Sequence, residues 1–310
     1  MFKQILLSLL LLGNIFSTIP IFQDARSSHY LLIHRNDNQI LEEQGSQEKI
    51  YPASLTKMMV VYVALELIKD DQNTAILPES LLKTLNQQGA AVSFYPSEKP
   101  ITYRDLLYGI ALPSGADCAI VLSQALSQTT EAFVEKMNET AQKLKMNHTH
   151  FKNVTGLHHY DHYTTLSDLR LFLKVALQNK DFTKIFNTQQ YTAQNGTTIQ
   201  HTLFQAMQKT KQIIPGYEGS KTGFTFEAGH CLAMWFHVQD DQYLYLSVKG
   251  PGDVYSNSHL SDAYLVSQRL QQRNYLNLGK YSLLISRDKQ PFSLNLYSKK
   301  TQLSFPFLKN

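Results

Sequence analysis

Hydrophobic positions follow two different spacings along this chain. In the middle they recur every three to four residues, the spacing of one helix face, at residues 52–69, 103–112, 117–127, 131–145 and 166–178. Towards both ends they form short runs typical of β-strands, at residues 29–35, 39–41, 231–238 and 243–248, before a last helical segment at 261–272. Strands that flank a helical middle predict an α+β fold, with one antiparallel sheet built from both ends of the chain.

The N-terminal segment has a composition of its own. Lys3 precedes a leucine-rich stretch, and residues 4–23 hold no charged side chain. A single early lysine before an apolar block is typical of a secretory signal. The stretch also approaches the roughly 20 residues that span a bilayer. We therefore expect residues 1–23 to be a signal peptide or an uncleaved membrane anchor, the protein to be exported, and membrane contact to occur only through this segment.

Composition narrows the class of protein. The 310 residues are 43% hydrophobic and 17% charged, with 14 glycines and 10 prolines. Such an apolar fraction is typical of a folded globular protein and excludes collagen-like, low-complexity and disordered chains. The net charge of +4 is spread without long basic runs, so nucleic acid, which needs a concentrated basic patch, is not an expected partner.

The cysteines indicate neither a disulfide framework nor a metal centre. Cys118 and Cys231 are only two, and they lack the paired spacing of a metal site. We expect two buried free thiols, with a bridge between them as the alternative for an exported chain. We expect no metal and no cofactor.

A first candidate for chemistry lies at the start of the helix predicted from Pro52. Ser54 and Lys57 are three residues apart, so one helix face carries both and the amine can approach the hydroxyl. A serine hydroxyl becomes a good nucleophile when a neighbouring base takes its proton. Lysine serves as that base if burial or nearby positive charge lowers its pKa from about 10.4 towards neutrality. The Ser-x-x-Lys pattern is also common by chance, as the polar start of a helix.

Two further motifs lie downstream. Ser114-Gly115-Ala116 falls in a break between two predicted helices, and Lys221-Thr222-Gly223 lies on a predicted strand. The lysine and threonine offer a positive charge and a hydroxyl that suit a substrate carboxylate. The glycine lets a substrate backbone approach the strand closely. Each motif alone is weak, but their order is that of a catalytic set found in penicillin-binding proteins and class A β-lactamases.

With these motifs the chain resembles the low-molecular-mass penicillin-binding proteins, specifically the serine D-alanyl-D-alanine carboxypeptidases. Four segments carry the resemblance: residues 51–59 (Tyr-Pro-Ala-Ser-Leu-Thr-Lys-Met-Met), 151–157 (Phe-Lys-Asn-Val-Thr-Gly-Leu), 162–169 (His-Tyr-Thr-Thr-Leu-Ser-Asp-Leu) and 219–232, which contains Lys-Thr-Gly-Phe-Thr and Ala-Gly-His-Cys-Leu. The resemblance covers about residues 28–272, which we expect to be the catalytic domain. It implies a β-lactamase/transpeptidase-like fold, with an antiparallel sheet flanked by helices and an all-helical subdomain.

The resemblance also implies an activity. The protein would remove the terminal D-Ala from peptidoglycan stem peptides through an acyl-enzyme, and it would bind penicillin covalently. Its partners would be stem peptides that end in D-Ala-D-Ala, with β-lactam antibiotics as covalent inhibitors. Its place would be the outer face of the cytoplasmic membrane, the cell wall or the medium.

The same resemblance implies a role for each motif residue. Ser54 is the acylated nucleophile, Lys57 the general base for acylation, and Ser114 a proton relay to the leaving group. Lys221 and Thr222 receive the terminal carboxylate of the substrate, beside Gly223. The backbone N–H groups of Ser54 and Phe224 form the oxyanion hole.

The sequence departs from the family pattern at two places. The second motif of the family is usually Ser-x-Asn, whereas the third position here is Ala116. One missing hydrogen-bonding amide costs about 1–3 kcal/mol, so a peptidoglycan- or penicillin-binding protein with little turnover is the alternative function. Many relatives also carry a C-terminal β domain and an anchoring helix, for which residues 273–310 are too few. We expect a short extension there, with a strand pair at 282–286 and 292–296.

Two other enzymes need consideration. A class A β-lactamase requires a glutamate that activates the deacylating water, and residues 148–157, where it is expected, contain none. A zinc carboxypeptidase is suggested by five histidines close together in the chain, because three would hold a catalytic zinc. These are His148, His150, His158, His159 and His162. The alternative to zinc is a solvated loop, and His162 is already accounted for by the family segment at residues 162–169.

Overall fold

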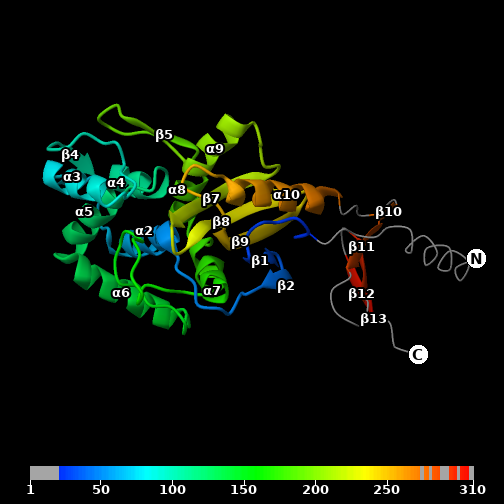
Figure 1. Ribbon diagram of the computed structural model, residues 1–310. Helices are drawn as coiled ribbons and strands as arrows, with labels where there is room; N and C mark the ends of the chain where they lie inside the picture. Colours follow the sequence, from blue (N-terminus) through cyan, green and yellow to red (C-terminus); the bar gives the residue numbers. More distant parts are fainter. Residues whose placement is uncertain (1–20, 273–275, 279–280, 287–292, 299–300, 307–310) are drawn as a thin grey trace, which may run out of the picture. The chain divides into compact units, whose positions relative to one another are not determined.

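The main sheet of the protein joins strands from both ends of the chain (Figure 1). The computed structural model describes residues 21–272, 276–278, 281–286, 293–298 and 301–306. The strands of this sheet are β1 (His29–His34), β2 (Gln39–Gln44), β7 (Tyr217–Thr225), β8 (Gly229–Val238) and β9 (Asp241–Gly250). Their order is β2-β1-β9-β8-β7 and each neighbouring pair is antiparallel. The sheet therefore has the composition that the hydrophobic pattern predicts.

Burial distinguishes the middle of this sheet from its edges. Eight of the ten residues of β8 and seven of the ten of β9 are buried, as expected for strands that are covered on both faces. β2, at one edge, is half-buried to exposed throughout. β7 forms the other edge and carries the Lys-Thr-Gly motif. The third motif thus lies on a strand that has one side free of sheet pairing.

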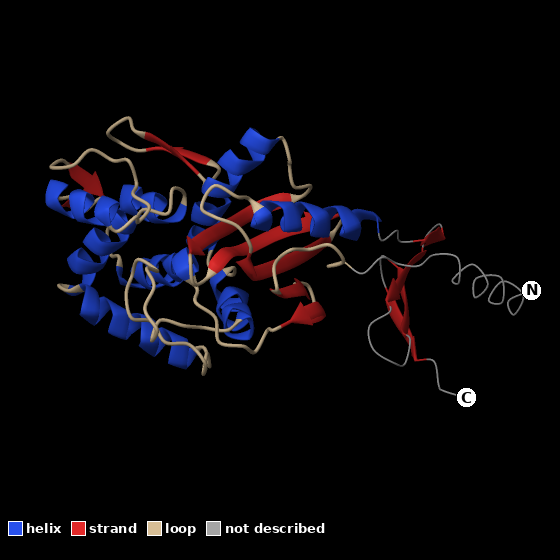
Figure 2. Ribbon diagram, viewed as in Figure 1, coloured by secondary structure: helices blue, strands red, loops and turns tan. Residues whose placement is uncertain are grey.

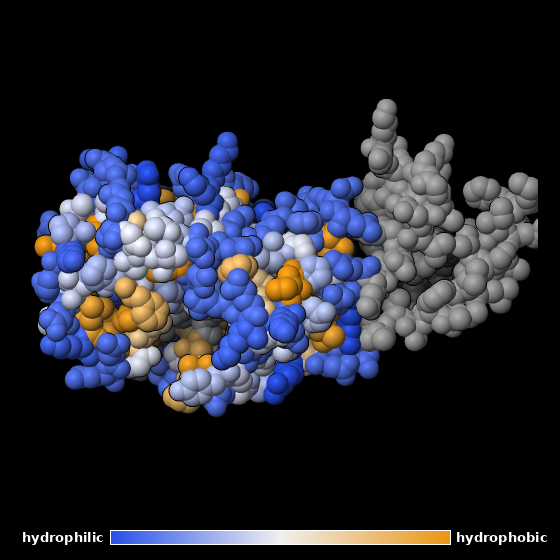
Figure 3. All heavy atoms as spheres, turned by 90° about the horizontal axis from the view of Figure 1, so that it is seen from above, coloured by the Kyte–Doolittle hydropathy of each residue, from blue (hydrophilic) through white to orange (hydrophobic). Residues whose placement is uncertain are grey.

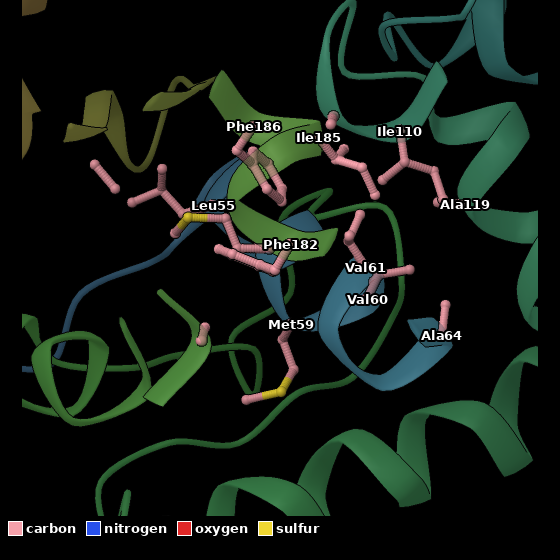
Figure 4. Packing of buried hydrophobic residues seen from close by; sticks show 14 of the residues in the cluster. Leu55, Met59, Val60, Val61, Ala64, Ile110, Ala119, Phe182, Ile185 and Phe186 are labelled. Atoms are coloured by element: carbon pink, nitrogen blue, oxygen red, sulfur yellow. The ribbon is translucent and has the colours of Figure 1, made fainter. Parts of the chain in front are cut away.

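Helix α2 (Thr56–Leu67) is the centre of the helical part. Eight of its twelve residues are buried, on all sides of the helix, because apolar residues cover nearly its whole circumference. Figure 4 shows Val60, Val61 and Ala64 among side chains of other helices, including Ile110, Ala119 and Phe182. The surrounding helices are α4 (Tyr103–Ala111), α5 (Ala116–Ser127), α6 (Thr130–Lys143), α7 (Leu166–Ala176) and α8 (Lys180–Asn187). A helix buried in this way holds its first turn firmly.

Helices and sheet occupy different regions of residues 26–264. Figure 2 shows α3 (Glu79–Gln87), α4, α5 and α6 gathered at one end, apart from the sheet. Threonines begin two of these helices: Thr102 before α4 and Thr129 before α6 each accept a hydrogen bond from a backbone N–H of the first turn, as Thr165 does before α7. The all-helical subdomain implied by the resemblance corresponds to this end.

Several short elements are absent from the hydrophobic pattern. They are α3, α8, α9 (Thr202–Thr210), and the two-stranded sheets β3 (Thr74–Ile76) with β4 (Pro100–Thr102) and β5 (Gln190–Thr192) with β6 (Thr198–Gln200). None is longer than nine residues, and the four strands have three residues each. Stretches of this length show too little periodicity to be recognised from sequence alone.

The chain divides into two units, residues 26–264 and a second unit made of residues 1–25 with 265–310. The second unit contains a four-stranded antiparallel sheet in the order β10 (Leu276–Leu278), β11 (Tyr281–Ser286), β12 (Ser293–Ser298) and β13 (Thr301–Pro306). β11 and β12 pair where the sequence predicts two strands, and β10 and β13 extend that pair on either side. Helix α10 (Ser258–Gln272) begins in the first unit.

The export segment and the cysteines were also predicted from sequence. Residues 1–20, which hold most of the expected signal or anchor, lie outside the described residues. Among the helices that the structure describes, none has the length and hydrophobicity to span a bilayer. Cys118 and Cys231 are both buried free thiols, as expected, and burial raises the pKa of each.

Hydrophilic side chains predominate on the face shown in Figure 3, where hydrophobic residues form separate patches. A few large hydrophobic side chains are mostly exposed, among them Phe94, Tyr160, Phe226 and Tyr255. Phe226 follows directly on β7. Apolar surface therefore adjoins the end of the strand that carries the third motif.

Candidate active site

Ser54 lies in a short 3-10 helix, η1 (Ala53–Leu55), that leads directly into α2. Its side chain is half-buried, whereas Ala53 and Leu55 on either side are buried. Ala53 has a φ of +47°, a left-handed conformation that is rare for residues other than glycine. Backbone of this kind persists where the surrounding structure holds it in place. The serine thus stands at a tightly held turn before a buried helix.

Lys57 occupies the first turn of α2 and is 1% exposed. Its Nζ donates a hydrogen bond to Ser54 Oγ at 3.1 Å and another to the carbonyl oxygen of Thr155 at 2.5 Å. Burial disfavours the ammonium form and lowers the pKa of Lys57 to about 7, although the negative charge of Asp117 acts in the opposite direction. At neutral pH a large fraction of this lysine is a free amine, which is able to accept a proton.

Ser114 connects the second motif to the third. It lies in the loop between α4 and α5 with a φ of +67°. Lys221, on β7, donates hydrogen bonds from Nζ to Ser114 Oγ at 2.9 Å and to the carbonyl oxygen of Thr222 at 2.8 Å. The helical part and the sheet are thereby joined at two residues that the sequence predicts to share one site.

Lys221 is a second buried lysine, with no exposed surface. Burial lowers the pKa of Lys221 well below its ordinary value, and the positive charge of Lys57 lowers it further. An opposite charge within a few ångströms reverses this effect, because it favours the ammonium form. A carboxylate that reached Nζ would therefore raise the pKa of Lys221 and bind to it as an ion pair.

Gly223 brings β7 against the turn that carries Ser54. A Cβ atom added to Gly223 would lie 2.9 Å from the backbone nitrogen of Ser54 and 3.1 Å from Ala53 Cβ. Real Cβ atoms almost never approach another atom that closely. The missing side chain of Gly223 is therefore what allows β7 to lie directly against η1. First and third motifs meet here.

The neighbours of Gly223 on β7 are both half-buried. The hydroxyl of Thr222 lies 2.6 Å from the hydroxyl of Thr202, at the start of α9. The ring of Phe224 packs against His230 and Phe226, with ring centroids 4.7 Å and 5.7 Å away. The backbone of Phe224 directly follows Gly223, the residue of β7 that lies against the Ser54 nitrogen.

The loop from residue 148 to 165 supplies the second partner of Lys57. Asn153 shapes its turn: its side-chain oxygen accepts hydrogen bonds from the backbone N–H groups of Thr155 and Gly156, and its amide donates to the carbonyl oxygen of Leu157. Gly156 has a φ of +78° and lies so close to the carbonyl of Ala53 that no Cβ would fit. The turn thereby presents the Thr155 carbonyl to Lys57.

The family model described as D-alanyl-D-alanine carboxypeptidase, peptidase family S11, matches residues 17–247. The chain belongs to this family. The resemblance read from the motifs is therefore confirmed.

Named relatives of the S11 family agree. The chain is 30% identical over 218 residues to the D-alanyl-D-alanine carboxypeptidase DacF of Bacillus subtilis (strain 168), covering 69% of this chain and 54% of the relative. It is 27% identical over 235 residues to DacA of Escherichia coli (strain K12), covering 71% and 55%. The chain spans about half the length of the curated relatives it matches.

Solved structures confirm the predicted fold class. The DD-transpeptidase of Streptomyces K15 superposes with a TM-score of 0.69 at 21% identity, covering 80% of this chain and 97% of the other. A D-alanyl-D-alanine carboxypeptidase of Mycobacterium tuberculosis H37Rv gives 0.70 at 22% identity, covering 84% and 96%. Identities this low establish the fold and no more.

Ala116 remains the departure from the S11 pattern. It is 1% exposed at the start of α5, and its backbone nitrogen donates to the carbonyl oxygen of Ala91. The carboxylate of the next residue, Asp117, accepts hydrogen bonds from the backbone nitrogen of Ser93 at 3.0 Å and from its hydroxyl at 2.5 Å. Asp117 thus holds the loop around Ser93, between α3 and β4. The hydrogen-bond acceptor beside Lys57 is the Thr155 carbonyl.

Several of the histidines that suggest zinc use their ring nitrogens on protein atoms. His162 is 2% exposed; its Nε2 lies 2.6 Å from the hydroxyl of Thr56, and its Nδ1 accepts from the backbone nitrogen of Lys152 at 2.9 Å. His150 uses Nδ1 on the carbonyl oxygen of Asp161. Within the described residues, no three histidine, cysteine or acidic side chains converge as metal ligands would.

The structure brings Ser54, Lys57, Ser114, Lys221 and Gly223 together, with Thr222 and Phe224 on the same strand. Sequence reasoning missed three contributors: the Thr155 carbonyl, Asn153 and His162. The combination of Asn153 and Gly156 is a turn signal that sequence alone offers. A backbone carbonyl acts independently of its side chain, so no residue pattern would have identified Thr155.

Proposed function

We propose that the protein is a serine D-alanyl-D-alanine carboxypeptidase, which removes the terminal D-Ala from peptidoglycan stem peptides through an acyl-enzyme on Ser54. The observation that carries the proposal is the 3.1 Å contact between Ser54 Oγ and the buried Lys57 Nζ, with the pKa of Lys57 lowered to about 7. This contact joins a nucleophile to a base that is deprotonated near neutral pH. Membership of the S11 family supports the reaction class.

Acylation would begin with proton transfer from Ser54 to the neutral amine of Lys57. As Oγ forms a bond to the carbonyl carbon between the two D-Ala residues, the carbonyl electrons move to oxygen. The backbone N–H groups of Ser54 and Phe224 stabilise this oxyanion, and each such donor is worth about 3 kcal/mol or more. The C–N bond then breaks while the proton passes through Ser114 to the departing nitrogen. Free D-Ala leaves, and an ester remains on Ser54.

Deacylation would return the enzyme to its starting state. Lys57, neutral again, accepts a proton from a water molecule as the water oxygen attacks the ester carbonyl. The same oxyanion hole stabilises the second tetrahedral intermediate. When the bond between the carbonyl carbon and Oγ breaks, the proton returns from Lys57 to Ser54 Oγ. The shortened peptide leaves with a new terminal carboxylate.

Recognition of the terminal carboxylate would fall to Lys221 and Thr222. The buried position of Lys221 Nζ gives an ion pair with the carboxylate little competition from water. The hydroxyl of Thr222 offers a second donor on the same strand. Peptidoglycan lies outside the cytoplasmic membrane, so an enzyme that acts on it has to be exported. The composition of residues 1–23 predicts this export.

The proposal is tested with purified protein and a peptide that ends in D-Ala-D-Ala. Release of free D-Ala is measured, and labelled penicillin is added to a parallel sample, followed by peptide mapping. We expect D-Ala release and a covalent adduct on Ser54, with both lost in Ser54→Ala. An adduct on another residue, or no adduct while Ser54 is intact, would contradict the nucleophile assignment.

The same two measurements distinguish an enzyme from a binding protein. Ala116 removes an amide that family members place in the second motif, and this favours the low-turnover alternative. In that case penicillin still labels Ser54, but D-Ala release stays at the level of the Ser54→Ala control. Labelling together with release above that control supports the carboxypeptidase.

A further inference from the structure

A chain of hydrogen bonds reaches the backbone at Ser54 from His162, which lies 106 positions after Thr56 in the sequence. The Nδ1 atom of His162 accepts a hydrogen bond from the backbone nitrogen of Lys152 at 2.9 Å, so this ring nitrogen carries no proton. Burial lowers the pKa of His162 to about 3, which keeps the ring neutral. Its single proton therefore resides on Nε2, which donates to the hydroxyl of Thr56 at 2.6 Å.

The hydroxyl of Thr56 connects His162 to the backbone of η1. Since it accepts from His162, its own proton is free to donate, and it points to the carbonyl oxygen of Ala53 at 2.8 Å. All three groups are buried, with exposed fractions of 2% for His162, 1% for Thr56 and 2% for Ala53. Hydrogen bonds away from water are stronger and more costly to leave unmade.

The carbonyl of Ala53 belongs to the same peptide unit as the N–H group of Ser54. A peptide unit is planar and trans, so its C=O and N–H point in opposite directions and turn together. The Ser54 nitrogen lies on the side of Gly223, where the oxyanion hole is proposed. A hydrogen bond that fixes the carbonyl at one end of this unit therefore fixes the N–H at the other end.

Ala53 would not hold this orientation by itself. Its φ of +47° is unfavourable for a residue with a Cβ. Relaxation to an ordinary φ would rotate the adjoining peptide unit and swing the Ser54 N–H away from β7. The hydrogen bond from the Thr56 hydroxyl to the Ala53 carbonyl opposes this rotation.

We propose that His162 and Thr56 are positioning residues that aim the Ser54 N–H into the oxyanion hole. This inference rests on the proposed function, since it assigns a purpose to the same site. Neither residue touches the reacting atoms. Their contribution is realised where negative charge develops on the carbonyl oxygen, so it affects the transition state more than the bound substrate.

The decisive variants are Thr56→Val, which removes the hydroxyl at nearly constant shape, and Thr56→Ser, which keeps it. Thr164→Val is the matched control, because Thr164 is a fully buried threonine in the same region whose hydroxyl bonds to Thr149. We expect Thr56→Val to slow penicillin acylation about tenfold or more, the effect of one ordinary hydrogen bond. Thr56→Ser and Thr164→Val should stay within about threefold of wild type.

A peptide boronic acid reports on the oxyanion hole directly. Its boron forms a tetrahedral adduct with a serine oxygen, and a boron-bound oxygen then lies where the oxyanion forms. In Thr56→Val the affinity for the boronic acid should fall by about the same factor as the acylation rate, while KM for the peptide changes little. A wild-type acylation rate in Thr56→Val, or an equal loss in KM and boronic acid affinity, would overturn the proposal.

The histidine is tested through its coupling to the threonine. His162→Gln should reproduce the loss seen in Thr56→Val, and the double variant should lose no more than either single one, because both act through one hydrogen-bonded chain. Additive losses would overturn the role of His162. If His162→Gln fails to fold, the Thr56 variants still decide the matter. If wild-type protein itself forms no adduct with penicillin, the proposed function fails, which is a separate outcome.

Discussion

Two lysines with similar burial carry different chemistry because their neighbours differ. Lys57 and Lys221 are both buried, and burial lowers the pKa of both. Lys57 faces the hydroxyl of Ser54, which has a proton to give. Lys221 faces Ser114 and lies on an edge strand of the sheet. Two ammonium groups in one dry site repel each other, and the positive charge of Lys57 lowers the pKa of Lys221 in addition to burial.

The pKa of Lys57 sets the expected pH dependence of acylation. Below about pH 7 the amine is protonated and unable to accept the serine proton. The rate constant for penicillin acylation should therefore rise with pH through about 7 and level off above it. Folded Lys57→Arg, whose side chain stays charged at every accessible pH, should lose acylation, and circular dichroism checks that the variant is folded. A rate that stays flat between about pH 5.5 and 8.5 would contradict the role of Lys57 as the base.

Lys221 should matter most for substrates with a free carboxylate. In Lys221→Ala, kcat/KM for a peptide ending in D-Ala-D-Ala should fall about ten- to a hundredfold more than kcat/KM for its methyl ester, because only the carboxylate forms a charge-assisted bond. Both substrates are assayed with the same enzyme preparation, so loss of folded protein affects them equally. Equal losses would instead indicate that Lys221 acts on the pKa of Lys57.

At the scale of elements, the site depends on how closely β7 approaches η1. The two meet at Gly223, where an added methyl group would lie 2.9 Å from the Ser54 nitrogen. Neither the strand nor the turn has a flexible side chain at this contact that might yield. An alanine there must therefore push the strand and the nucleophile apart.

Gly223→Ala should abolish acylation of Ser54 while the sheet remains folded. The displaced strand carries both the Phe224 N–H and the residues proposed to bind the carboxylate, so a shift of a few tenths of an ångström spoils several contacts together. Penicillin labelling is measured beside circular dichroism. Thr225→Ala, two residues further along β7, is the control and should keep labelling. Wild-type labelling in Gly223→Ala would mean that β7 does not hold the site together.

Sequence predicted the long elements and the site residues better than their connections. The helix from Pro52 begins as η1 and continues as α2, and the strands at 231–238 and 243–248 are β8 and β9. The contact between His162 and Thr56 was beyond prediction, because periodicity carries no information on residues 106 positions apart. The left-handed conformation of Ala53 was also beyond prediction, since it is imposed by neighbours from other segments.

At the scale of the whole molecule, Asp262 connects the two ends of the first unit. It is 1% exposed, and its carboxylate accepts hydrogen bonds from the backbone nitrogens of Arg26 and Ser27, each at 2.8 Å, and from the Ser27 hydroxyl at 2.6 Å. These residues are more than 230 positions apart. Asp262 thereby fixes the segment that leads into β1.

Asp262→Ala should reduce the free energy of unfolding by about 2–3 kcal/mol, because it leaves buried donors without an acceptor. Asp262→Asn keeps one acceptor oxygen and should lose less. Urea unfolding followed by circular dichroism measures both, and penicillin labelling of the folded variants serves as the control for an intact site. An unchanged urea midpoint in Asp262→Ala would show that water or another group satisfies these donors.

The strand order β2-β1-β9-β8-β7 also has a consequence for the timing of folding. During synthesis β1 emerges early, but its inner neighbour β9 is the last strand of the sheet to leave the ribosome. Pairing across so long a stretch of chain requires closure of a large loop, and folds dominated by such pairing form slowly. The nascent polypeptide therefore remains without its central sheet until nearly all of the first unit exists. A chain without this sheet is still unfolded, and passage through a membrane pore requires an unfolded chain.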